Sequence, residues 1–486
     1  MREAGILMPI SSLASKYGVG DFGREAYQFV DLLQEAKCKI WQLLPLNPLG
    51  YGNSPYQPYS SIAMDELYIS LDMLCAQGLL DQPQPFQPLA KTVDYEHARQ
   101  HKEQYLKQAY HRFVSSGSDE SGYKEFMVQP WVYQFAVFMA FKKANELRCW
   151  NDWPDEQKQW IHHPQLDLTL YEEEIQYQMF LQYILFSQWN DLKAYANQRG
   201  IRIMGDLPFY VGIDSLDVWA NQACFLLDDK SHPTFIAGVP PDYFSVTGQR
   251  WGNPIYDWSH LKETGFSFWI ERLRANQEIF DIIRIDHFRA FDTYWKIPAT
   301  CPTAEEGAWI EAPGYEFFDV MQEKLPDIEL VVEDLGDLRK EVLELRDHYN
   351  FPGMKIVQFV FDPNENNNNF ADKENMIIYS GTHDNQTIRG WYRSQSAYRR
   401  RKIRAYFKTL GYPQETTAKQ FVRYTLDSIA KLAILPLQDI LGLDDSGRMN
   451  TPGTVGSPNW EWKLDRMERF AALVPWLKEA VAASKR

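Results

Sequence analysis

Short apolar runs recur along the chain and have the length of buried strands. Each run is too short for a helix and is dominated by aliphatic side chains, which is typical of strands that are covered on both faces. The runs are mostly apolar, although several contain polar positions. The eight runs lie at residues 5–10, 39–44, 201–207, 282–288, 330–335, 354–359, 376–380 and 432–437.

Segments with the period of an amphipathic helix lie between these runs. Residues 22–37 follow the first run, residues 266–280 lead into the fourth, and residues 338–348 follow the fifth. Strands that alternate with helices pair in parallel, because the helix supplies the crossover that parallel strands need. Eight such units predict an α/β fold, a closed (β/α)8 TIM barrel, and with insertions this fold can reach the 486 residues of the chain.

Two connections are longer than ordinary loops between a strand and a helix. Residues 45–200 contain helical patterns at 124–147 and 170–198 and predict a helical subdomain inserted after the second strand. Residues 208–276, rich in Gly, Pro and aromatic side chains, predict a second insertion after the third strand. No linker or repeat divides the chain, so we expect residues 1–486 to form one catalytic barrel unit.

The run at 282–288 carries charge where a buried strand should be apolar. In the period of a strand, Arg284 and Asp286 share one face with Ile282 and Phe288, so that a guanidinium and a carboxylate lie side by side. A buried ion pair adds little net stability, and such a pair at a strand end is better explained by chemistry than by packing. The alternative is an Arg–Asp pair that joins the strand end to a neighbouring loop.

Carboxylates also follow other strands. Asp206 lies at the end of the third run, Glu333 and Asp334 lie at the end of the fifth, and Asp384 follows the seventh. The carboxyl ends of barrel strands open onto one face, which carries the active site in this fold. We therefore expect the strand ends to bring these carboxylates into one cleft, although scattered helix caps and salt bridges would use the same residue types.

Two kinds of chemistry use clustered carboxylates with few basic partners. A divalent cation needs ligands that all stay ionised. Cleavage of a glycosidic bond needs one ionised carboxylate and one carboxyl that its surroundings keep protonated. The loop at 238–258, which combines Tyr, Phe and Trp with Gln and Asn, favours a neutral polyhydroxylated substrate but does not cleanly separate the two.

Composition argues against several classes of function. The net charge of −15 and the expected lack of a Lys/Arg cluster argue against nucleic acid, and no run approaches the ~20 apolar residues that span a membrane. The N-terminal residues lack the features of a signal peptide, so we expect a cytoplasmic protein. We expect neither a disulfide framework nor a zinc site, because the cysteines are odd in number, widely spaced and without a CxxC motif, at Cys38, Cys75, Cys149, Cys224 and Cys301.

Eight motifs in a fixed order identify a family resemblance that covers nearly the whole chain. They are YGNSPYQ at 51–57, GDLP at 205–208, GVPPDYFS at 238–245, TGQRWGNP at 247–254, RIDHFR at 284–289, EDLG at 333–336, GTHDN at 381–385 and RMNTPG at 448–453. Together they resemble the 4-α-glucanotransferases, the amylomaltases or disproportionating enzymes of glycoside hydrolase family 77.

This resemblance implies an enzyme that transfers α-1,4-glucan segments from one maltooligosaccharide to the 4-hydroxyl of another glucan or of glucose. The implied mechanism is a retaining double displacement without cofactor or metal, and dextrins from starch or glycogen would also be substrates. By resemblance, Asp286 would be the nucleophile and Glu333 the general acid/base. Asp384 would stabilise the transition state.

The resemblance also implies a set of substrate contacts. Arg284 would keep Asp286 ionised and oriented, which agrees with the face that the two residues share. His383 and Asp206 would hydrogen-bond to hydroxyls of the donor sugar. The further contacts implied are Tyr56, stacked on the donor ring, with Ser54 near it, then Tyr243, Phe244, Gln249 and Trp251 on a loop that folds over the glucan, and Asn450.

Three other functions compete with glucan transfer. The first is a glucan hydrolase or a bifunctional debranching enzyme, although no second catalytic domain is evident. The second is a noncatalytic glucan-binding protein, which would have little use for the acid and nucleophile pair Glu333 and Asp286. The third is a divalent-metal enzyme on the same barrel.

Overall fold

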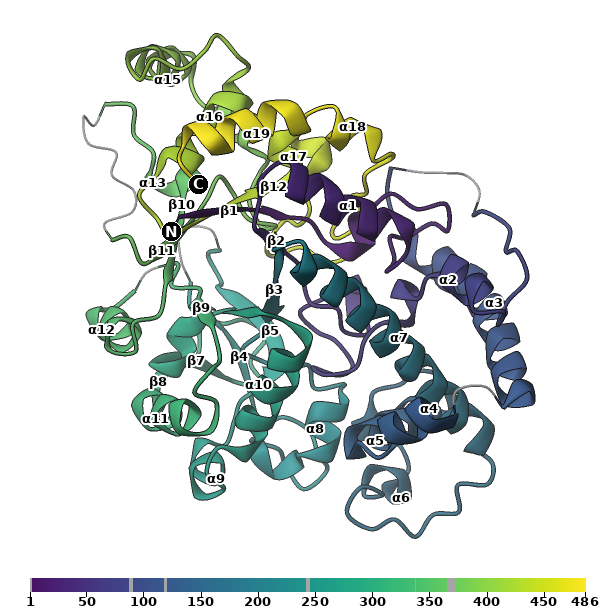
Figure 1. Ribbon diagram of the computed structural model, residues 1–486. Helices are drawn as coiled ribbons and strands as arrows, with labels where there is room; N and C mark the ends of the chain where they lie inside the picture. The colour runs from purple at the N-terminus through teal and green to yellow at the C-terminus, as the bar shows by residue number, and fades with distance from the viewer. Residues whose placement is uncertain (1, 87–90, 118–119, 242–244, 337, 365–372) are drawn as a thin grey trace.

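Eight parallel strands form a nearly closed barrel at the centre of the molecule (Figure 1). The computed structural model describes residues 2–86, 91–117, 120–241, 245–336, 338–364 and 373–486. Neighbouring strands pair in the order β10-β11-β12-β1-β2-β3-β6-β9, and the Val332 amide donates to the Pro352 carbonyl (3.0 Å) between the two end strands. The strands are β1 (Glu3–Leu7), β2 (Ile40–Gln42), β3 (Arg202–Leu207), β6 (Ile282–Ile285), β9 (Leu330–Val332), β10 (Gly353–Ile356), β11 (Met376–Tyr379) and β12 (Leu432–Pro436).

Each of these strands overlaps one of the eight apolar runs, so the predicted (β/α)8 barrel is confirmed. The strands are almost wholly buried, because helices cover the outside of the barrel and side chains fill its inside. The first strand pairs with the last, Glu3 opposite Leu432, and the two chain ends lie close together (Figure 1).

The strand at 282–288 is shorter than predicted. It ends at Ile285, after which the Asp286 amide still donates to the Leu207 carbonyl of β3 (3.0 Å). His287 then takes a left-handed backbone conformation, with φ of 53°, and a short 3₁₀ segment, η6 (Phe288–Phe291), follows. Phe288 is therefore buried in an aromatic cluster and does not extend the face of Arg284 and Asp286.

The predicted helices at 22–37, 266–280, 338–348 and 170–198 are confirmed as α1 (Arg24–Glu35), α10 (Ser267–Ile279), α12 (Lys340–His348) and α7 (Glu172–Gln198). The single helix predicted at 124–147 is wrong. Two helices, α4 (Glu120–Met127) and α5 (Pro130–Ala144), lie there instead, because Pro130 lacks an amide hydrogen and suits only the first turn of a helix.

The long connection between β2 and β3 contains α2 (Leu71–Ala76), α3 (Tyr95–Ser116), α4, α5, α6 (Asp155–Lys158) and α7. All but α7 lie on one side of the barrel, and α5 packs against α7 (Figure 1). The division of the chain into one barrel unit with insertions at 45–200 and 208–276 stays a prediction. The remaining helices are α8 (Leu216–Ala220), α9 (Trp258–Glu263), α11 (Gly314–Lys324), α13 (Val357–Val360), α14 (Ile388–Ser394), α15 (Ala397–Thr409), α16 (Thr417–Asp427), α17 (Leu437–Ile440), α18 (Glu468–Ala471) and α19 (Val474–Ala483).

A second sheet, which the sequence analysis did not foresee, lies beside the barrel. Its four antiparallel strands have the order β5-β4-β7-β8. The first two strands, β4 (Phe235–Val239) and β5 (Gln249–Pro254), belong to the excursion after β3. The other two, β7 (Thr293–Pro298) and β8 (Ala308–Glu311), belong to an excursion after β6. The pairing of β4 with β7 therefore joins two excursions that are separate in sequence.

The expectation that the chain has no Lys/Arg cluster is wrong. Helix α15 carries five basic side chains within six positions, at Arg399, Arg400, Arg401, Lys402 and Arg404. Within the described ranges, no helix combines the length and apolar character that crossing a bilayer requires. The five cysteines are free thiols, and of these Cys38 and Cys224 are buried.

Gly205 on β3 allows Phe280, which follows α10, to pack closely on the barrel. A Cβ atom at this position would lie 2.2 Å from the Phe280 ring, at the end of α10. We expect Gly205→Ala to destabilise the protein by about 1–3 kcal/mol, because the rigid ring must move. Gly212→Ala is the matched control, since its Cβ would meet only ordinary contacts at 3.7 Å. Urea unfolding should show this difference, and Phe280→Leu should restore part of the loss in the Gly205→Ala chain. Equal midpoints for the two glycine variants would contradict the packing argument.

Candidate active site

Three strands of the barrel end at one buried guanidinium. Arg284 Nη1 lies 2.6 Å from Asp206 Oδ1 and 3.0 Å from Asp286 Oδ1, and Nη2 lies 3.3 Å from Glu333 Oε2. The Arg284 side chain is only 4% exposed. The predicted pair of Arg284 with Asp286 is therefore present, within a cluster of three carboxylates around one cation.

The strand register explains why these side chains meet. Asp206 on β3 lies opposite Arg284 on β6, and Arg284 lies opposite Val331 on β9. Glu333 follows Val331 by two residues, as Asp286 follows Arg284, so all four functional side chains point to the same side of the sheet. Their common position at the carboxyl ends of the strands is where barrel enzymes carry their active sites.

Glu333 is held in a setting that favours its protonated form. Burial and the like charge of Asp286 raise its pKa well above that of an ordinary glutamate, although Arg284 acts in the opposite direction. The His287 amide donates a hydrogen bond to Glu333 Oε2 (2.7 Å), and the left-handed conformation of His287 accompanies this orientation. The site thus combines an oriented carboxyl that has a raised pKa with a neighbouring acidic side chain, Asp286, which is 27% exposed.

Asp384 lies in the opposite electrostatic setting. Burial alone would raise the pKa of Asp384, but the charge of His383 and hydrogen bonds from His383 and Asn450 lower it to about 2. Asn450 Nδ2 lies 2.6 Å from Asp384 Oδ1, and His383 Nε2 lies 3.4 Å from Oδ2. Asp384 is consequently ionised throughout the neutral range, as a carboxylate that stabilises positive charge must be.

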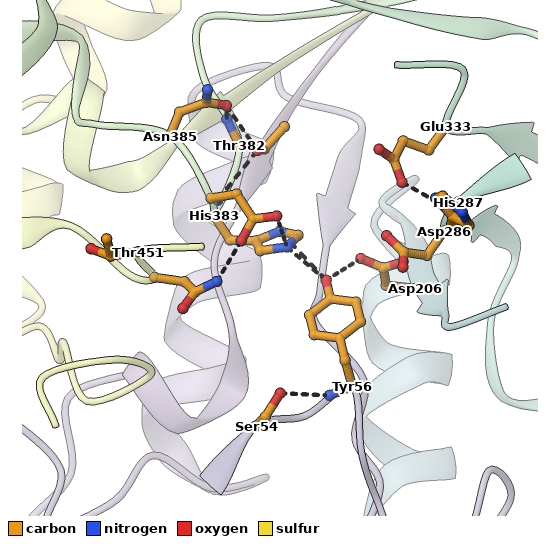
Figure 2. A network of polar contacts seen from close by, with 12 residues as sticks. Ser54, Tyr56, Asp206, Asp286, His287, Glu333, Thr382, His383, Asn385 and Thr451 are labelled. Carbon is orange, nitrogen blue, oxygen red and sulfur yellow. Dashed lines mark hydrogen bonds and ion pairs between the residues drawn. The ribbon is translucent and has the colours of Figure 1, made fainter. Parts of the chain in front are cut away.

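Tyr56 connects the two sides of the cleft. Figure 2 shows its hydroxyl between Asp206, with Asp286 and Glu333 beyond, and His383. The hydroxyl donates to Asp206 Oδ2 (2.8 Å) and lies 2.9 Å from His383 Nε2. The Tyr56 ring also stacks on the imidazole, with ring centroids 5.2 Å apart. Both oxygens of Asp206 therefore have protein partners, and its predicted contact with a sugar hydroxyl stays a prediction.

The loop that carries His383 and Asp384 is anchored by residues that the sequence analysis missed. Asp439, buried behind the loop, accepts from the Ser380 hydroxyl (2.6 Å) and from the Ile388 amide (2.7 Å). Arg448 Nη2 donates to the Asp384 carbonyl (2.9 Å). Arg448 belongs to the motif at 448–453, but the sequence analysis assigned it no role. Asp439 is a carboxylate that closely follows the last apolar run, and this position was the signal that could have identified it.

Two of the residues predicted for the covering loop, Gln249 and Trp251, lie on β5. Trp251 packs edge-on against His287, with ring centroids 5.0 Å apart, and its indole donates to Gln249 Oε1 (3.2 Å). Gln57 Nε2 donates to the Trp251 carbonyl (2.9 Å), and the Ser54 hydroxyl accepts from the Tyr56 amide (3.3 Å). Two further predicted contacts, Tyr243 and Phe244, lie outside the described residues.

Chelation of a metal is not evident among the described side chains, where no group of three or more His, Cys, Asp or Glu residues is arranged to hold an ion. The three carboxylates around Arg284 have a cation in the form of a guanidinium at their centre. This guanidinium offsets part of their negative charge.

Comparison with known proteins agrees with this geometry. A family model described as 4-alpha-glucanotransferase matches residues 8–468. The chain is 45% identical to a 4-alpha-glucanotransferase of Synechocystis sp. over 479 residues, which cover 95% of this chain and 94% of that protein. It is 42% identical to a 4-alpha-glucanotransferase of Streptococcus pneumoniae, over 95% of this chain and 93% of that protein. The amylomaltase of Streptococcus agalactiae, solved in complex with acarbose, matches with a TM-score of 0.94 and 36% identity over 100% of both chains.

The raised pKa of Glu333 predicts how stability depends on pH. The folded state binds this proton more tightly than the unfolded state, so Glu333 lowers stability as pH rises from the ordinary glutamate range through its own raised pKa. Glu333→Gln removes that loss and retains the oxygen that accepts from His287. We expect the melting midpoint of the variant to exceed that of the parent by a margin that grows with pH.

Scanning calorimetry between acidic and mildly alkaline pH measures this margin. Glu263→Gln, at an exposed position of α9, is the control and should show no such trend. A margin for Glu333→Gln that does not change with pH would show that the proton is bound equally in both states.

Proposed function

The chain belongs to the 4-alpha-glucanotransferase family, glycoside hydrolase 77, and on this basis we propose that Asp286, Glu333 and Asp384 carry the transfer of α-1,4-glucan segments between maltooligosaccharides. The observation that carries the assignment is the shared guanidinium of Arg284, which contacts Asp286 and Glu333 while the pKa of Glu333 is raised. Retaining glycosidases need such a closely spaced pair, with carboxyl groups about 5–5.5 Å apart, one ionised and one protonated.

In the first step, Glu333 donates its proton to the glycosidic oxygen of the donor glucan. Asp286 attacks the anomeric carbon, the bond to the reducing-end fragment breaks, and a covalent glycosyl ester forms on the aspartate. The charge that develops on the ring in the transition state faces Asp384, whose lowered pKa of about 2 keeps it negative.

In the second step, Glu333 is the base. It removes the proton from the 4-hydroxyl of an acceptor glucan or of glucose as that oxygen attacks the anomeric carbon, and Asp286 leaves as a carboxylate. The α-1,4 bond is remade with retained configuration, and Glu333 regains its proton for the next cycle. Two inversions at one carbon account for the retention.

Transfer exceeds hydrolysis only if a sugar competes successfully with water for the intermediate. Trp251 is placed to favour the sugar over water, since it lies against His287, the residue that directly follows the nucleophile. An aromatic side chain at this point can hold an acceptor in place and reduce the access of water during the life of the intermediate. Gln57 ties the backbone of Trp251 to the loop that carries Tyr56.

A reducing compartment suits this chain, because its cysteines are free thiols. We therefore assign the enzyme to the cytoplasm as part of the same proposal. Its substrates there would be maltooligosaccharides and the dextrins released from storage glucans, with glucose as an acceptor.

The product pattern from maltotriose tests the reaction type. With purified protein, in parallel samples with and without a chelator, we expect glucose together with chains longer than maltotriose, because each transfer shortens one molecule and lengthens another. Chromatography of samples taken over time resolves the chain lengths. Glucose and maltose without longer chains would identify a hydrolase, and no turnover would favour a glucan-binding protein. Loss of activity on chelation would identify a metal-dependent enzyme.

A donor that needs no acid separates the roles of the two carboxyl groups. On maltooligosaccharides, we expect Glu333→Gln to lower kcat by roughly 10²–10⁴-fold, the usual contribution of a general acid. On α-maltosyl fluoride, whose fluoride leaves without protonation, the same variant should form the glycosyl ester but transfer it slowly. Mass spectrometry of a peptide digest should then show the mass of one maltosyl group added to the peptide that contains Asp286. Asp286→Asn should form no adduct, and modification of another residue would move the nucleophile elsewhere.

A further inference from the structure

Trp309 presents an exposed aromatic ring on the outer strand of the second sheet. It lies on β8, an edge strand whose side chains are mostly exposed, and is itself 40% exposed. Exposed tryptophans are uncommon on a folded surface because the ring is large and mostly apolar. The position of this one, rather than its exposure alone, is what points to a ligand.

The ring is held rigidly from behind. The guanidinium of Arg289 lies over it at 4.0 Å from the centroid, and Trp295 packs against it with centroids 5.2 Å apart at an angle of 63°. Trp295 is fixed in turn by a hydrogen bond from its indole to the Ala304 carbonyl (3.0 Å). A Cβ at Gly307 would lie 2.5 Å from the Trp295 ring, so glycine at this position allows the close packing. An aromatic ring fixed in this way loses little conformational freedom when a ligand binds.

The support for Trp309 comes from the segment that directly follows the nucleophile. Arg289 is three residues after Asp286, so the Cα atoms of these residues are at most about 11 Å apart. The same segment contacts Trp251 through His287, at 5.0 Å. Trp251 and Trp309 thus lie on the two outer strands of one sheet, β5 and β8, and both contact the segment 287–289.

We propose that Trp309 is a distal sugar-binding platform that stacks on a glucose unit of long α-glucans, beyond the sugars that react at Asp286. A pyranose ring has faces made of C–H groups, which pack on a flat aromatic ring. The segment that supports Trp309 begins directly after Asp286, to which the proposed function assigns a glucan chain. The inference rests on that proposed function for its ligand.

The distance from the nucleophile sets the length dependence. A maltotriose bound across Asp286 fills only the sites nearest the reacting bond, whereas a long chain that leaves the cleft along the second sheet can reach Trp309. Stacking at the platform therefore adds affinity for long glucans and adds little for short ones. The platform lets the enzyme discriminate by length without any change in the catalytic carboxylates.

Kinetics of three variants test the platform. Trp309→Ala removes the ring, Trp309→Phe keeps a ring that packs on Arg289, and Tyr398→Ala removes a 59% exposed ring from α15, far from the second sheet (Figure 1). For each, kcat/KM is measured with amylose as donor and glucose as acceptor, by loss of iodine colour, and with maltotriose, by release of glucose. We expect the ratio of kcat/KM for amylose to that for maltotriose to fall about 3- to 10-fold in Trp309→Ala, the size of one aromatic stacking contact. The ratio should change less in Trp309→Phe and stay constant in Tyr398→Ala.

Binding without turnover supplies the second readout. In native gels that contain amylose, the parent protein and Trp309→Phe should be retarded more than Trp309→Ala. A fall of equal size for both donors would mean that Trp309 only supports the segment at Arg289, and an unchanged ratio with unchanged retardation would overturn the platform altogether. Failure of the parent protein to convert maltotriose would count against the proposed function instead, and the gel would still decide whether Trp309 binds amylose.

Discussion

A single buried guanidinium makes this active site possible. Arg284 contacts Asp206, Asp286 and Glu333, each from a different strand end, and is almost fully shielded from water. Three carboxylates so close together would repel one another, and a buried guanidinium without partners would be strongly unfavourable. The guanidinium and the carboxylates therefore stabilise one another. The parallel register of β3, β6 and β9 brings these groups together, so the barrel and the chemistry depend on the same strand pairing.

The two sides of the cleft use one type of side chain for opposite purposes. Burial and a neighbouring carboxylate raise the pKa of Glu333, whereas an imidazole and an amide lower that of Asp384. Environment alone thus shifts the pKa values of two carboxyl groups in opposite directions, as in other enzymes with paired carboxyl groups. Tyr56 links the two environments through a hydroxyl that contacts both Asp206 and His383, which couples the orientation of the two sides.

Much of the fold could be predicted because barrel strands are largely apolar on both faces and stand out as short, mostly apolar runs. Strand periodicity predicted that Arg284 and Asp286 lie side by side. The clustered carboxylates were predicted because they lie at the ends of four of the runs. The left-handed turn at His287 could not be predicted, since it depends on the aromatic and carboxylate neighbours that surround it. The second sheet was not predicted because its strands are short and partly exposed, and because β4 pairs with β7, which is distant in the sequence. The anchoring of the His383 loop by Asp439 likewise needed tertiary structure.

Because the excursions after β3 and β6 share one sheet, they are expected to evolve together. Gly238 of β4 lies between Arg250 of β5 and Trp295 of β7, and a Cβ at this glycine would meet both the Gln249 backbone and the Ile297 side chain. Recombination that replaced only residues 208–276 by those of a relative would pair β4 of one protein with β7 of another. These two strands would not have evolved together. Chimeric enzymes of this family are therefore best divided at boundaries that carry residues 208–313 across as one block, and natural variation in either excursion should be matched by compensating change in the other.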